Sequence, residues 1–322
     1  MTILGNNIYH EEKIFKKELN NIFKNFHYVC DEAKIKNNNS FYSYILNDTP
    51  LVLRNHNNNT SCFSNICLHR SCLIHKLGFG NKKFMCNYHG WKYNENGNLI
   101  SSPLIKKKIN LKLKKFYTKN INGLIFCSLK KKIQMNLPND ISVGKIFNRN
   151  KIIHNANWKL LVENVLEGYH LSFVHKNTFS KINYMSSSKS KNYFYKFGSK
   201  SILFNSKNPN KNYTHYFIFP NLFFSIADDL IGYIGYFIPK SPTETVLHYA
   251  NFETKNISKY SKKVKDIIKK EAINFAFKSI IEDKEVVELS QIGLTYSKNK
   301  HRLFDKEKRI SHFYKIYKDN IN

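Results

Sequence analysis

Two short stretches, Cys67-Leu-His69 and Cys86-Asn-Tyr-His89, decide how the first half of the chain folds. Each stretch offers one thiolate and one imidazole, and sixteen residues separate the first stretch from the second. Two cysteines can hold one iron of a two-iron, two-sulfur cluster while two histidines hold the other iron. A zinc finger of the Cys2His2 type instead places both cysteines in one half and both histidines in the other. Because each stretch here is mixed, we expect these four side chains to bind a [2Fe–2S] cluster rather than zinc.

The two stretches and the residues that follow them resemble the Rieske signature of the ring-hydroxylating oxygenase α subunits. That family also includes the choline monooxygenase-like and other quaternary-ammonium oxygenases. The segments that carry the resemblance are Cys67-Leu-His-Arg-Ser71 and Cys86-Asn-Tyr-His-Gly-Trp-Lys-Tyr93. Two positions depart from the family pattern, since Ser71 stands where the family usually has Gly and Asn87 where it usually has Pro. Neither departure removes a ligand of the expected cluster.

The other four of the six cysteines are expected to be thiols without a role in the cluster. In respiratory-complex Rieske proteins, a cysteine at the position of Cys72 forms a disulfide with a cysteine two residues after the second cluster cysteine. Tyr88 occupies that second position here, so the respiratory type is disfavoured and Cys72 is expected to be a buried thiol. We expect the same of Cys30, Cys62 and Cys127.

Composition and charge narrow the class of protein. Residues 1–7 lack the charged-then-apolar pattern of a signal peptide, and no run approaches the ~18 apolar residues needed to span a bilayer. We therefore expect a cytoplasmic protein that does not bind a membrane. The formal charge of +29 invites a nucleic-acid-binding interpretation, but the lysines are scattered along the whole chain and accompany abundant Asn, Ile, Phe and Tyr. We interpret the charge as a solvated basic surface that can steer an acidic redox partner, with no nucleic acid as a partner.

The hydrophobic pattern changes along the chain from strand-like to helical and back. Residues 26–66 contain short strand-like runs separated by polar turns, and 124–129 resembles a closing strand. Helical periodicity begins at Asn157. Alternation typical of an antiparallel sheet spans 193–253, and a helical pattern returns at 260–294.

These patterns predict an α+β chain with two domains. Residues 1–150 are expected to form an all-β Rieske [2Fe–2S] domain with an N-terminal extension. Residues 151–322 are expected to form a mononuclear non-haem iron catalytic domain, for which the resemblance implies a helix-grip-like antiparallel sheet.

The segment Asn157-Trp-Lys-Leu-Leu-Val-Glu-Asn-Val-Leu-Glu-Gly-Tyr-His-Leu-Ser-Phe-Val-His175 carries a second set of metal-binding residue types. Two histidines and one carboxylate that leave open positions form the facial triad of non-haem Fe(II) oxygenases, in which O2 must reach the metal beside the substrate. His170 and His175 lie five residues apart, which on a straight helix separates their directions by about 140°. The helix must therefore end or bulge near His170, a distortion that Gly168 permits. Glu167 lies three residues before His170 and shares its helix face.

This segment resembles the family motif Glu-Asn-x-x-Asp/Glu-x-Tyr-His-x4-His at every position. The resemblance implies that His170 and His175 bind the mononuclear iron and that Asn164 lies near it. It also implies that Glu167 connects His170 to a Rieske histidine of a neighbouring subunit, which by position is His89. Family members commonly form trimers, so we expect a homotrimer in which cluster and iron pair across the subunit interface.

The carboxylate ligand of the iron is sought in the late helical region. Residues 280–294 resemble the late helix of the family, in which an acid is followed by Gln and Gly. The resemblance implies that Asp283 is the ligand, with Glu282 as the alternative beside it and Asp228 or Asp229 as weaker alternatives. An acidic pair can also simply stabilise a helix N-terminus.

The resemblance implies a Rieske-type oxygenase that uses the cluster, Fe(II) and O2 to hydroxylate, dihydroxylate or oxidatively demethylate a small organic substrate of aromatic or quaternary-ammonium type. Glu167 and Asn164 are the expected catalytic residues beside the iron. Electrons are expected to come from NAD(P)H through a separate reductase or ferredoxin, because the chain lacks a nucleotide-binding glycine fingerprint. The alternative is a Rieske electron-transfer protein without oxygenase activity, which needs only the cluster.

Overall fold

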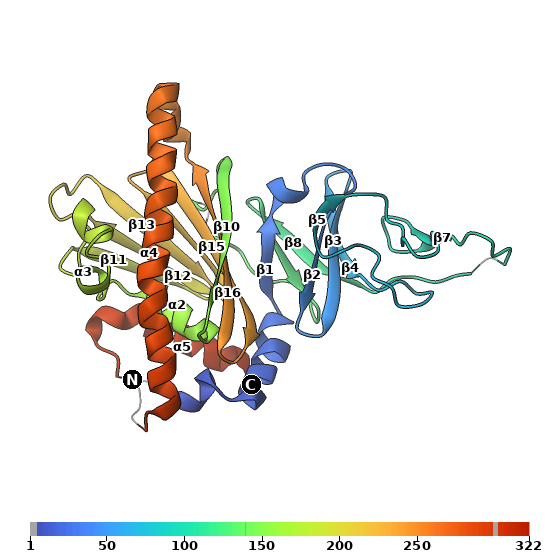
Figure 1. Ribbon diagram of the computed structural model, residues 1–322, viewed down its shortest axis with the longest axis horizontal. Helices are drawn as coiled ribbons and strands as arrows, with labels where there is room; N and C mark the ends of the chain where they lie inside the picture. Colours follow the sequence, from blue (N-terminus) through green and yellow to red (C-terminus); the bar gives the residue numbers. More distant parts are fainter. Residues whose placement is uncertain (1–4, 108, 139, 299–301, 322) are drawn as a thin grey trace. The chain divides into compact units, whose positions relative to one another are not determined.

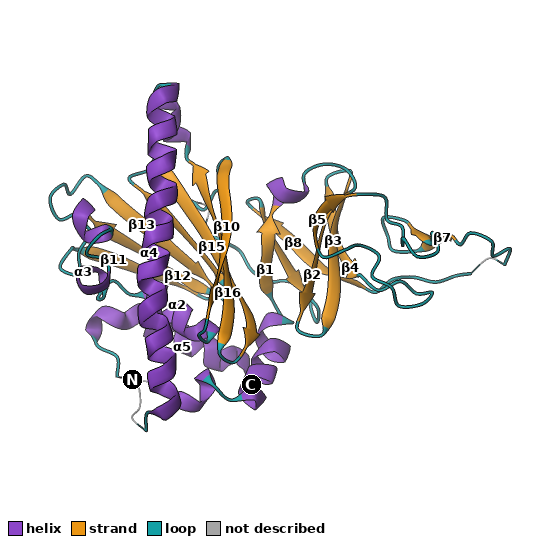
Figure 2. Ribbon diagram, viewed as in Figure 1, coloured by secondary structure: helices purple, strands orange, loops and turns teal. Residues whose placement is uncertain are grey.

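Ile22–Ser142 pack mainly against one another and form the first unit of the chain, which is built largely from strands. The second unit comprises Met1–Asn21 with Val143–Asn322 and combines a sheet with helices. This architecture confirms the predicted α+β class (Figure 2). The domain limits predicted from the sequence, 1–150 and 151–322, stay a prediction. The computed structural model describes residues 5–107, 109–138, 140–298 and 302–321.

The first unit contains a seven-stranded antiparallel sheet in the order β1-β9-β8-β4-β3-β2-β5 and a two-stranded sheet of β6 and β7. Its strands are β1 (His27–Asp31), β2 (Ser40–Leu46), β3 (Thr49–His56), β4 (Asn59–Ser64), β5 (Gly78–Asn81), β6 (Lys92–Tyr93), β7 (Leu99–Ser101), β8 (Lys115–Ile121) and β9 (Leu124–Ser128). A 3₁₀ turn at Glu32–Ile35 follows β1. The cysteines Cys67 and Cys86 are buried in an apolar cluster that includes Phe63, Phe84 and Trp91.

Two hairpins of this sheet turn over residue pairs with positive φ. Asn57 and Asn58 connect β3 to β4 with φ of 47° and 64°, and Asn122 and Gly123 connect β8 to β9 with φ of 54° and 81°. Positive φ at both positions of a two-residue turn matches the right-handed twist of the paired strands, and Asn and Gly tolerate it. Asn57-Asn58 and Asn122-Gly123 therefore form tight two-residue turns.

The second unit contains a seven-stranded antiparallel sheet in the order β10-β16-β15-β14-β13-β12-β11. Its strands are β10 (Ile146–His154), β11 (Ser190–Tyr195), β12 (Gly198–Phe204), β13 (Asn212–Ile218), β14 (Leu222–Ala227), β15 (Ile231–Ser241) and β16 (Glu244–Glu253). Its α-helices are α1 (Glu12–Glu18), α2 (Trp158–Leu166), α3 (Leu171–Val174), α4 (Lys262–Tyr296) and α5 (Lys308–Ile321). Short 3₁₀ turns lie at Asn6–Tyr9, Phe179–Ile182, Lys255–Lys259 and Asp305–Glu307, and a π-helical segment at Leu19–Phe23 follows α1. Because β11 to β16 pair consecutively, these strands form a meander with β10 added beside β16.

The long helix α4 crosses one face of this sheet (Figure 1). Ser261 caps its first turn, because the serine side chain accepts a hydrogen bond from the Val264 N–H. Ala276, Ile280 and Val287 are buried along the helix side that faces the unit's interior. A long helix over an antiparallel sheet is the arrangement predicted for the second half of the chain. No helix within the described ranges has the length and apolar character that crossing a membrane requires.

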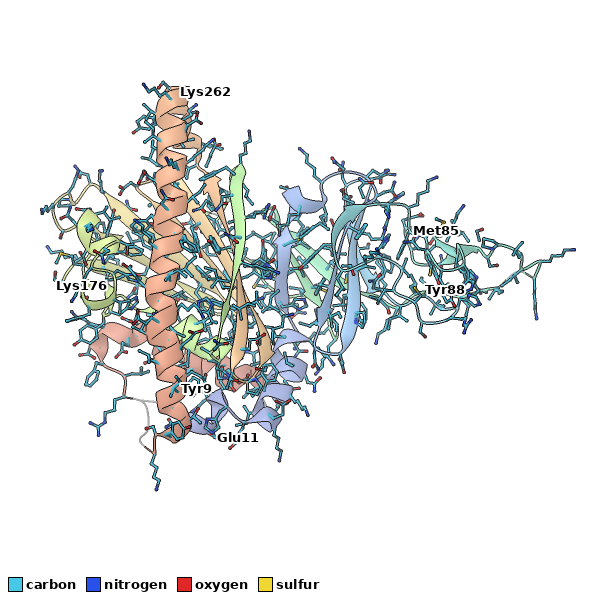
Figure 3. The ribbon with its side chains drawn as sticks, in the orientation of Figure 1. Tyr9, Glu11, Met85, Tyr88, Lys176 and Lys262 are labelled. Atoms are coloured by element: carbon cyan, nitrogen blue, oxygen red, sulfur yellow. The ribbon has the colours of Figure 1, made fainter. Side chains whose placement is uncertain are left out.

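Asn157 fixes the start of α2 against α4. Its side-chain oxygen accepts from the Lys159 N–H at 3.0 Å, and its side-chain amide donates to the Pro242 carbonyl at 2.7 Å. Its backbone N–H donates at 2.8 Å to the side-chain oxygen of Gln291 in α4. The Gln291 amide in turn donates to the carbonyl of Tyr9, a fully buried residue near one end of α4 (Figure 3). The N-terminal segment is thus part of the packing that orients both helices.

A fully buried ion pair joins α1 to α2. Lys159 Nζ lies 2.5 Å from Glu18 Oε1, and both side chains are 0% exposed. Trp158 Nε1 donates to the other carboxylate oxygen of Glu18 at 2.8 Å, and the Tyr317 hydroxyl donates to Oε1 at 2.6 Å. Burial lowers the pKa of Lys159, and the Glu18 charge opposes that shift. The carboxylate therefore has three donors, one of which carries the compensating charge.

We expect Lys159→Met to lower the free energy of unfolding by about 3–5 kcal/mol, because it leaves the Glu18 carboxylate buried without its counter-charge. The double variant Glu18→Gln/Lys159→Met should recover most of the loss. Urea unfolding measures both changes. Lys16→Met is the matched control, since the Lys16–Glu12 pair is exposed and its loss should change stability little. Equal effects of Lys159→Met and Lys16→Met would contradict a structural role for the buried pair.

Candidate functional site

The two Cys/His stretches of the first unit fold into loops with the same hydrogen-bond pattern. The Cys67 N–H donates to the carbonyl five residues later at 2.9 Å, and the Cys67 carbonyl accepts from the N–H four residues later at 3.1 Å. Cys86 repeats both contacts at 2.9 and 3.0 Å. Each cysteine is therefore held at the start of a closed turn, with its histidine inside that turn.

The fourth residue after each cysteine has the left-handed backbone conformation. Gly90 has φ of 71° in the second loop, and Ser71 has φ of 52° at the same place in the first. Glycine adopts such angles most easily, which explains why a glycine is usual at the position of Ser71. The first loop keeps the same backbone geometry with a serine, so this departure from the family pattern does not alter the loop.

The histidine rings of the two loops meet at the surface. His69 Nδ1 and His89 Nδ1 lie 3.1 Å apart, and both residues are exposed. The Trp91 ring stacks on His69 with a centroid distance of 4.8 Å. The ring of Tyr88, which is 55% exposed, packs against that of His89 with a centroid distance of 3.8 Å. The rings are thus fixed by aromatic neighbours while one edge stays open to solvent.

The thiols lie below these rings in the interior. Cys67 and Cys86 are 2% and 1% exposed, and burial raises the pKa of the Cys67 thiol. The Tyr93 hydroxyl lies 3.3 Å from Cys67 Sγ and accepts from the Leu68 N–H at 3.1 Å. All six cysteines are free; Cys72 is half-buried rather than buried, and the other three outside the loops are buried as expected.

In the second unit the chain leaves helical geometry before the first of the two expected iron-binding histidines. Helix α2 ends at Leu166, and Glu167 is extended with φ of −124° and ψ of 158°. The Glu167 carboxylate accepts from the N–H groups of Tyr169 and His170, and α3 then begins after His170. The spacing of the histidines predicted this break. The Arg309 guanidinium donates to the Leu166 carbonyl at 3.4 Å and so stabilises the helix end.

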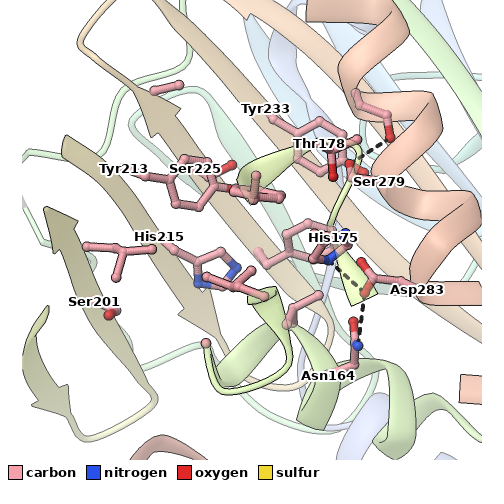
Figure 4. Close-up of a pocket in the computed structure, with 18 of the residues that line it drawn as sticks. Asn164, His175, Thr178, Ser201, Tyr213, His215, Ser225, Tyr233, Ser279 and Asp283 are labelled. Atoms are coloured by element: carbon pink, nitrogen blue, oxygen red, sulfur yellow. Dashed lines mark hydrogen bonds and ion pairs between the residues drawn. The ribbon is translucent and has the colours of Figure 1, made fainter. Parts of the chain in front are cut away.

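The break brings three potential ligand atoms together. His175 Nε2 lies 3.1 Å and His170 Nε2 3.5 Å from Asp283 Oδ1. Among the described residues, this is a group of His, Cys, Asp or Glu side chains whose ligand atoms all lie within 4.8 Å of one another. His170 and His175 flank α3 at its two ends. Asp283 comes from α4, and its carboxylate lies beside His175 (Figure 4).

Each of the two histidine rings also contacts a second carboxylate, through Nδ1. Glu167 accepts from His170 Nδ1, and Glu282 accepts from His175 Nδ1 at 2.8 Å. The Thr178 hydroxyl donates to the same Glu282 oxygen at 2.6 Å. Such contacts fix the ring orientation and the tautomer, so both Nε2 atoms face the space beside Asp283. Burial lowers the pKa of His175, but Asp283 and Glu282 together raise it above its usual value.

The remaining acidic candidates and Asn164 have distinct places. The Asn164 amide donates to Asp283 Oδ1 at 3.1 Å, so it orients the carboxylate (Figure 4). Asp228 accepts from the Tyr184 hydroxyl at 2.6 Å, and the Asp229 carbonyl accepts from Thr254. Neither of these aspartates belongs to the group around His170.

A cavity of about 770 Å³ lies between helices α2, α3 and α4 and the sheet of the second unit (Figure 4). The sheet forms one wall of this cavity. Polar residues that lie opposite one another on six neighbouring strands form a row across that wall, and all of them line the cavity. The row is Asn192, Ser201, His215, Ser225, Tyr233 and Asn251. The next row, Leu203, Tyr213, Ala227 and Ile231, is more apolar. The sheet wall therefore offers a continuous row of polar groups to a molecule in the cavity.

The sequence did not predict the roles that three residues of this site have in the structure. The sequence offers Glu282 only as an alternative ligand. Neighbouring acids on a helix point about 100° apart, so they can contact different sides of one ring. His215 alternates with Tyr213 in a strand pattern, which could have marked both as facing one side. Arg309 has no local sequence signal of burial.

Comparisons with known proteins agree with this geometry. Residues 25–117 match the Rieske [2Fe–2S] domain family. The chain is similar to the anthranilate 1,2-dioxygenase large subunit of Acinetobacter baylyi, with 26% identity over 56% of this chain and 44% of the relative. It is also similar to putrescine 2-hydroxylase of Ralstonia nicotianae, with 26% identity over 51% of this chain and 47% of the relative. The chain thus spans about half the length of these curated relatives.

Solved structures extend the similarity in fold to the whole chain. The quaternary ammonium Rieske monooxygenase CntA in complex with L-carnitine has a TM-score of 0.82 at 19% identity, covering 99% of this chain and 96% of that one. Naphthalene 1,2-dioxygenase with bound indole has a TM-score of 0.78 at 16% identity, covering 99% and 92%. The family described as the ring hydroxylating alpha subunit, catalytic domain, matches residues 145–322, which is 178 of 322 residues. By this match the chain belongs to the ring-hydroxylating α-subunit family.

Proposed function

We propose that this protein is a Rieske-type oxygenase that uses a [2Fe–2S] cluster, a mononuclear Fe(II) and O2 to hydroxylate, dihydroxylate or oxidatively demethylate a small organic substrate. The observation that carries the proposal is the convergence of His170 Nε2, His175 Nε2 and Asp283 Oδ1 beside a cavity of about 770 Å³. An electron-transfer protein has no need of such a group or of a cavity next to it.

The donor set fits an iron site. Two imidazole nitrogens and one carboxylate oxygen are the ligands of non-haem Fe(II) oxygenases, and they leave coordination positions free. In the proposed site His170 and His175 bind through Nε2 and Asp283 binds through its carboxylate. Iron held there supplies the O2 activation that amino-acid side chains cannot supply themselves.

The chain's own residues keep these donors in position. Glu167 and Glu282 hold the Nδ1 protons of the two histidines, which makes the Nε2 atoms available as ligands. Asn164 donates to Asp283 and limits its rotation. The roles we propose for Glu167 and Asn164 are therefore to position His170 and Asp283, respectively.

The first unit is proposed to hold the cluster. Cys67 and Cys86 are buried side by side and His69 and His89 meet at the surface, which suits one iron with sulfur ligands and another with nitrogen ligands. Exposed histidine rings suit electron exchange with another protein surface. Within a proposed homotrimer, Glu167 would connect His170 to His89 of a neighbouring subunit. The solved structure of a quaternary ammonium Rieske monooxygenase has given insight into inter-subunit electron transfer in that protein.

The electron source is proposed from the family resemblance, and the substrate class from the compounds named for similar proteins. A separate reductase or ferredoxin is proposed to supply electrons from NAD(P)H. Relatives act on anthranilate, toluate and putrescine, and solved structures contain carnitine or indole. From these similar proteins we propose an aromatic or quaternary-ammonium substrate. A cytoplasmic location stays a prediction.

Anaerobic purification followed by iron analysis and EPR of the reduced protein tests the function. We expect a Rieske-type EPR signal and about three irons per chain, two in the cluster and one in the mononuclear site. A Rieske signal with only two irons after Fe(II) reconstitution would favour the electron-transfer alternative. Zinc in place of iron, with no signal from a reduced cluster, would refute the proposal.

Asp283→Asn and Glu282→Gln separate the proposed ligand from its neighbour. We expect Asp283→Asn to abolish binding of the mononuclear Fe(II) and Glu282→Gln to weaken it by about 10- to 100-fold, because Glu282 only orients a ligand. Anaerobic Fe(II) titration of cluster-loaded protein measures both. Glu285→Gln is the control, since this exposed acid lies on the same helix. The reverse order of effects would assign the ligand role to Glu282.

Tyr93→Phe should lower the reduction potential of the cluster. The hydroxyl lies 3.3 Å from Cys67 Sγ, and a hydrogen bond to a ligand sulfur stabilises the more negative, reduced cluster. A redox titration followed by EPR or visible absorption measures the change. Tyr117→Phe is the control, because this tyrosine of β8 is 48% exposed. An unchanged potential in Tyr93→Phe would mean that the hydroxyl serves only the Leu68 N–H.

A further inference from the structure

His215 lies within the polar row at the sheet wall of the cavity and has no part in the proposed handling of iron. It stands between Ser201 and Ser225 on the neighbouring strands, and Figure 4 shows its ring directed from the sheet into the space beside His175. The residue is only 7% exposed, and its ring stacks on Phe223 at 5.9 Å. Its surroundings therefore determine which hydrogen bonds it can make.

Arg309 determines where the proton of His215 resides. Nη2 of Arg309 donates to Nδ1 of His215 at 2.9 Å. A guanidinium has donors only, so Nδ1 must accept and carries no proton. Burial first, and then the charge of Arg309, lowers the pKa of His215 well below its usual value, so the ring is neutral at pH 7. A neutral ring with a bare Nδ1 carries its proton on Nε2.

This Nε2–H donor has no acceptor. Within the described part of the chain, Nε2 of His215 is buried and has no hydrogen-bond partner. Buried polar groups in folded proteins are rarely left in this state, since a donor removed from water without an acceptor is destabilising. Because the ring faces the cavity, an oxygen atom of a bound molecule is the partner that can complete its hydrogen bonding.

The charge beside this donor indicates the kind of oxygen. Besides His215, Arg309 donates to Ser199 Oγ at 3.0 Å and to the Leu166 carbonyl, which are both neutral acceptors. Burial lowers the pKa of Arg309 to about 9, which leaves the guanidinium charged at pH 7. A buried cation surrounded by neutral acceptors favours an anion in the adjoining space. Five acids among the described residues also line the cavity. Glu167 and Asp283 contact the two proposed ligand histidines, and Asp228 accepts from Tyr184; the other two are Glu271 and Asp305.

We propose that His215, with Arg309 behind it, binds a carboxylate group of the substrate at the sheet wall of the cavity. The inference rests on the proposed oxygenase function and deepens it, because it assigns the substrate to the small organic acids. The Nε2–H group donates to a carboxylate oxygen, and the rest of the molecule extends toward His175. His215 is then a specificity-determining residue that distinguishes acids from neutral molecules of the same shape.

Matched pairs of probes test this assignment without turnover. Acetate, butyrate and benzoate are compared with nitromethane, 1-nitropropane and nitrobenzene, in which a neutral nitro group replaces the carboxylate. Isothermal titration calorimetry is run anaerobically at pH 7 on the protein loaded with cluster and iron. We expect at least one acid to bind about 10-fold or more tightly than its nitro counterpart, as fits a hydrogen bond to a charged group.

Substitutions at His215 locate the preference. His215→Phe keeps a ring of similar size and removes the donor, so the acid and its nitro counterpart should bind equally. His215→Gln keeps a side-chain N–H and should retain part of the preference. His312→Phe is the control, because His312 donates to the carbonyls of Tyr195 and Gly198 and does not line the cavity. Thermal unfolding of each variant shows whether it folds.

A crystal structure with the preferred acid is the second measurement and needs no variant. We expect a carboxylate oxygen about 2.7–3.2 Å from His215 Nε2. Equal affinity within all three pairs, an unchanged preference in His215→Phe, or a water alone on Nε2 in the crystal overturns the inference. Iron content and EPR report separately on the proposed function. Full metal loading without acid preference therefore rejects only the inference, whereas acid preference without the mononuclear iron rejects the oxygenase.

Discussion

From helix α5, the buried guanidinium of Arg309 donates to the end of α2, to β12 and to β13 at the same time. A planar cation with five donors in fixed directions can hold three acceptors in one geometry, which a lysine ammonium cannot do. Because its acceptor Leu166 is the last residue of α2, this contact sets where the chain leaves the helix. Glu167 and His170 follow within four residues, so the ligand geometry and the sheet wall of the cavity share one anchor.

The second constraint is that each ligand histidine lies between two acidic groups. His175 has Glu282 at Nδ1 and Asp283 at Nε2, although these acids are neighbours on the same helix. The turn of about 100° per residue makes this possible, since one helix presents the two side chains to opposite edges of a ring that lies across it. The acids around the two rings concentrate negative charge at the three donors, and a divalent cation bound there would neutralise part of it.

Local spacing made much of this arrangement predictable. The cluster loops depend on residues within about six positions of each cysteine, and the helix break depends on the five-residue interval between His170 and His175. The sequence favoured Asp283 over Glu282 only through the family resemblance, because the choice depends on which ring nitrogen each acid reaches. The contact of Arg309 with His215 joins residues 94 positions apart. That of Glu18 with Lys159 joins residues 141 apart, and no local pattern records such packing.

The polar row across the sheet has a consequence for how such a chain can diversify. Each of its members comes from a different strand, and each side chain stands roughly perpendicular to a backbone that its neighbours hold in register. Apart from His215, which shares Arg309 with the end of α2, a position of the row can therefore be exchanged while the strand pairing stays as it is. The three possible ligand atoms come from helices and their ends, whereas the polar row lies on the sheet. On this plan, a single substitution in the sheet changes the wall of the cavity and leaves the side chains of His170, His175 and Asp283 unaltered.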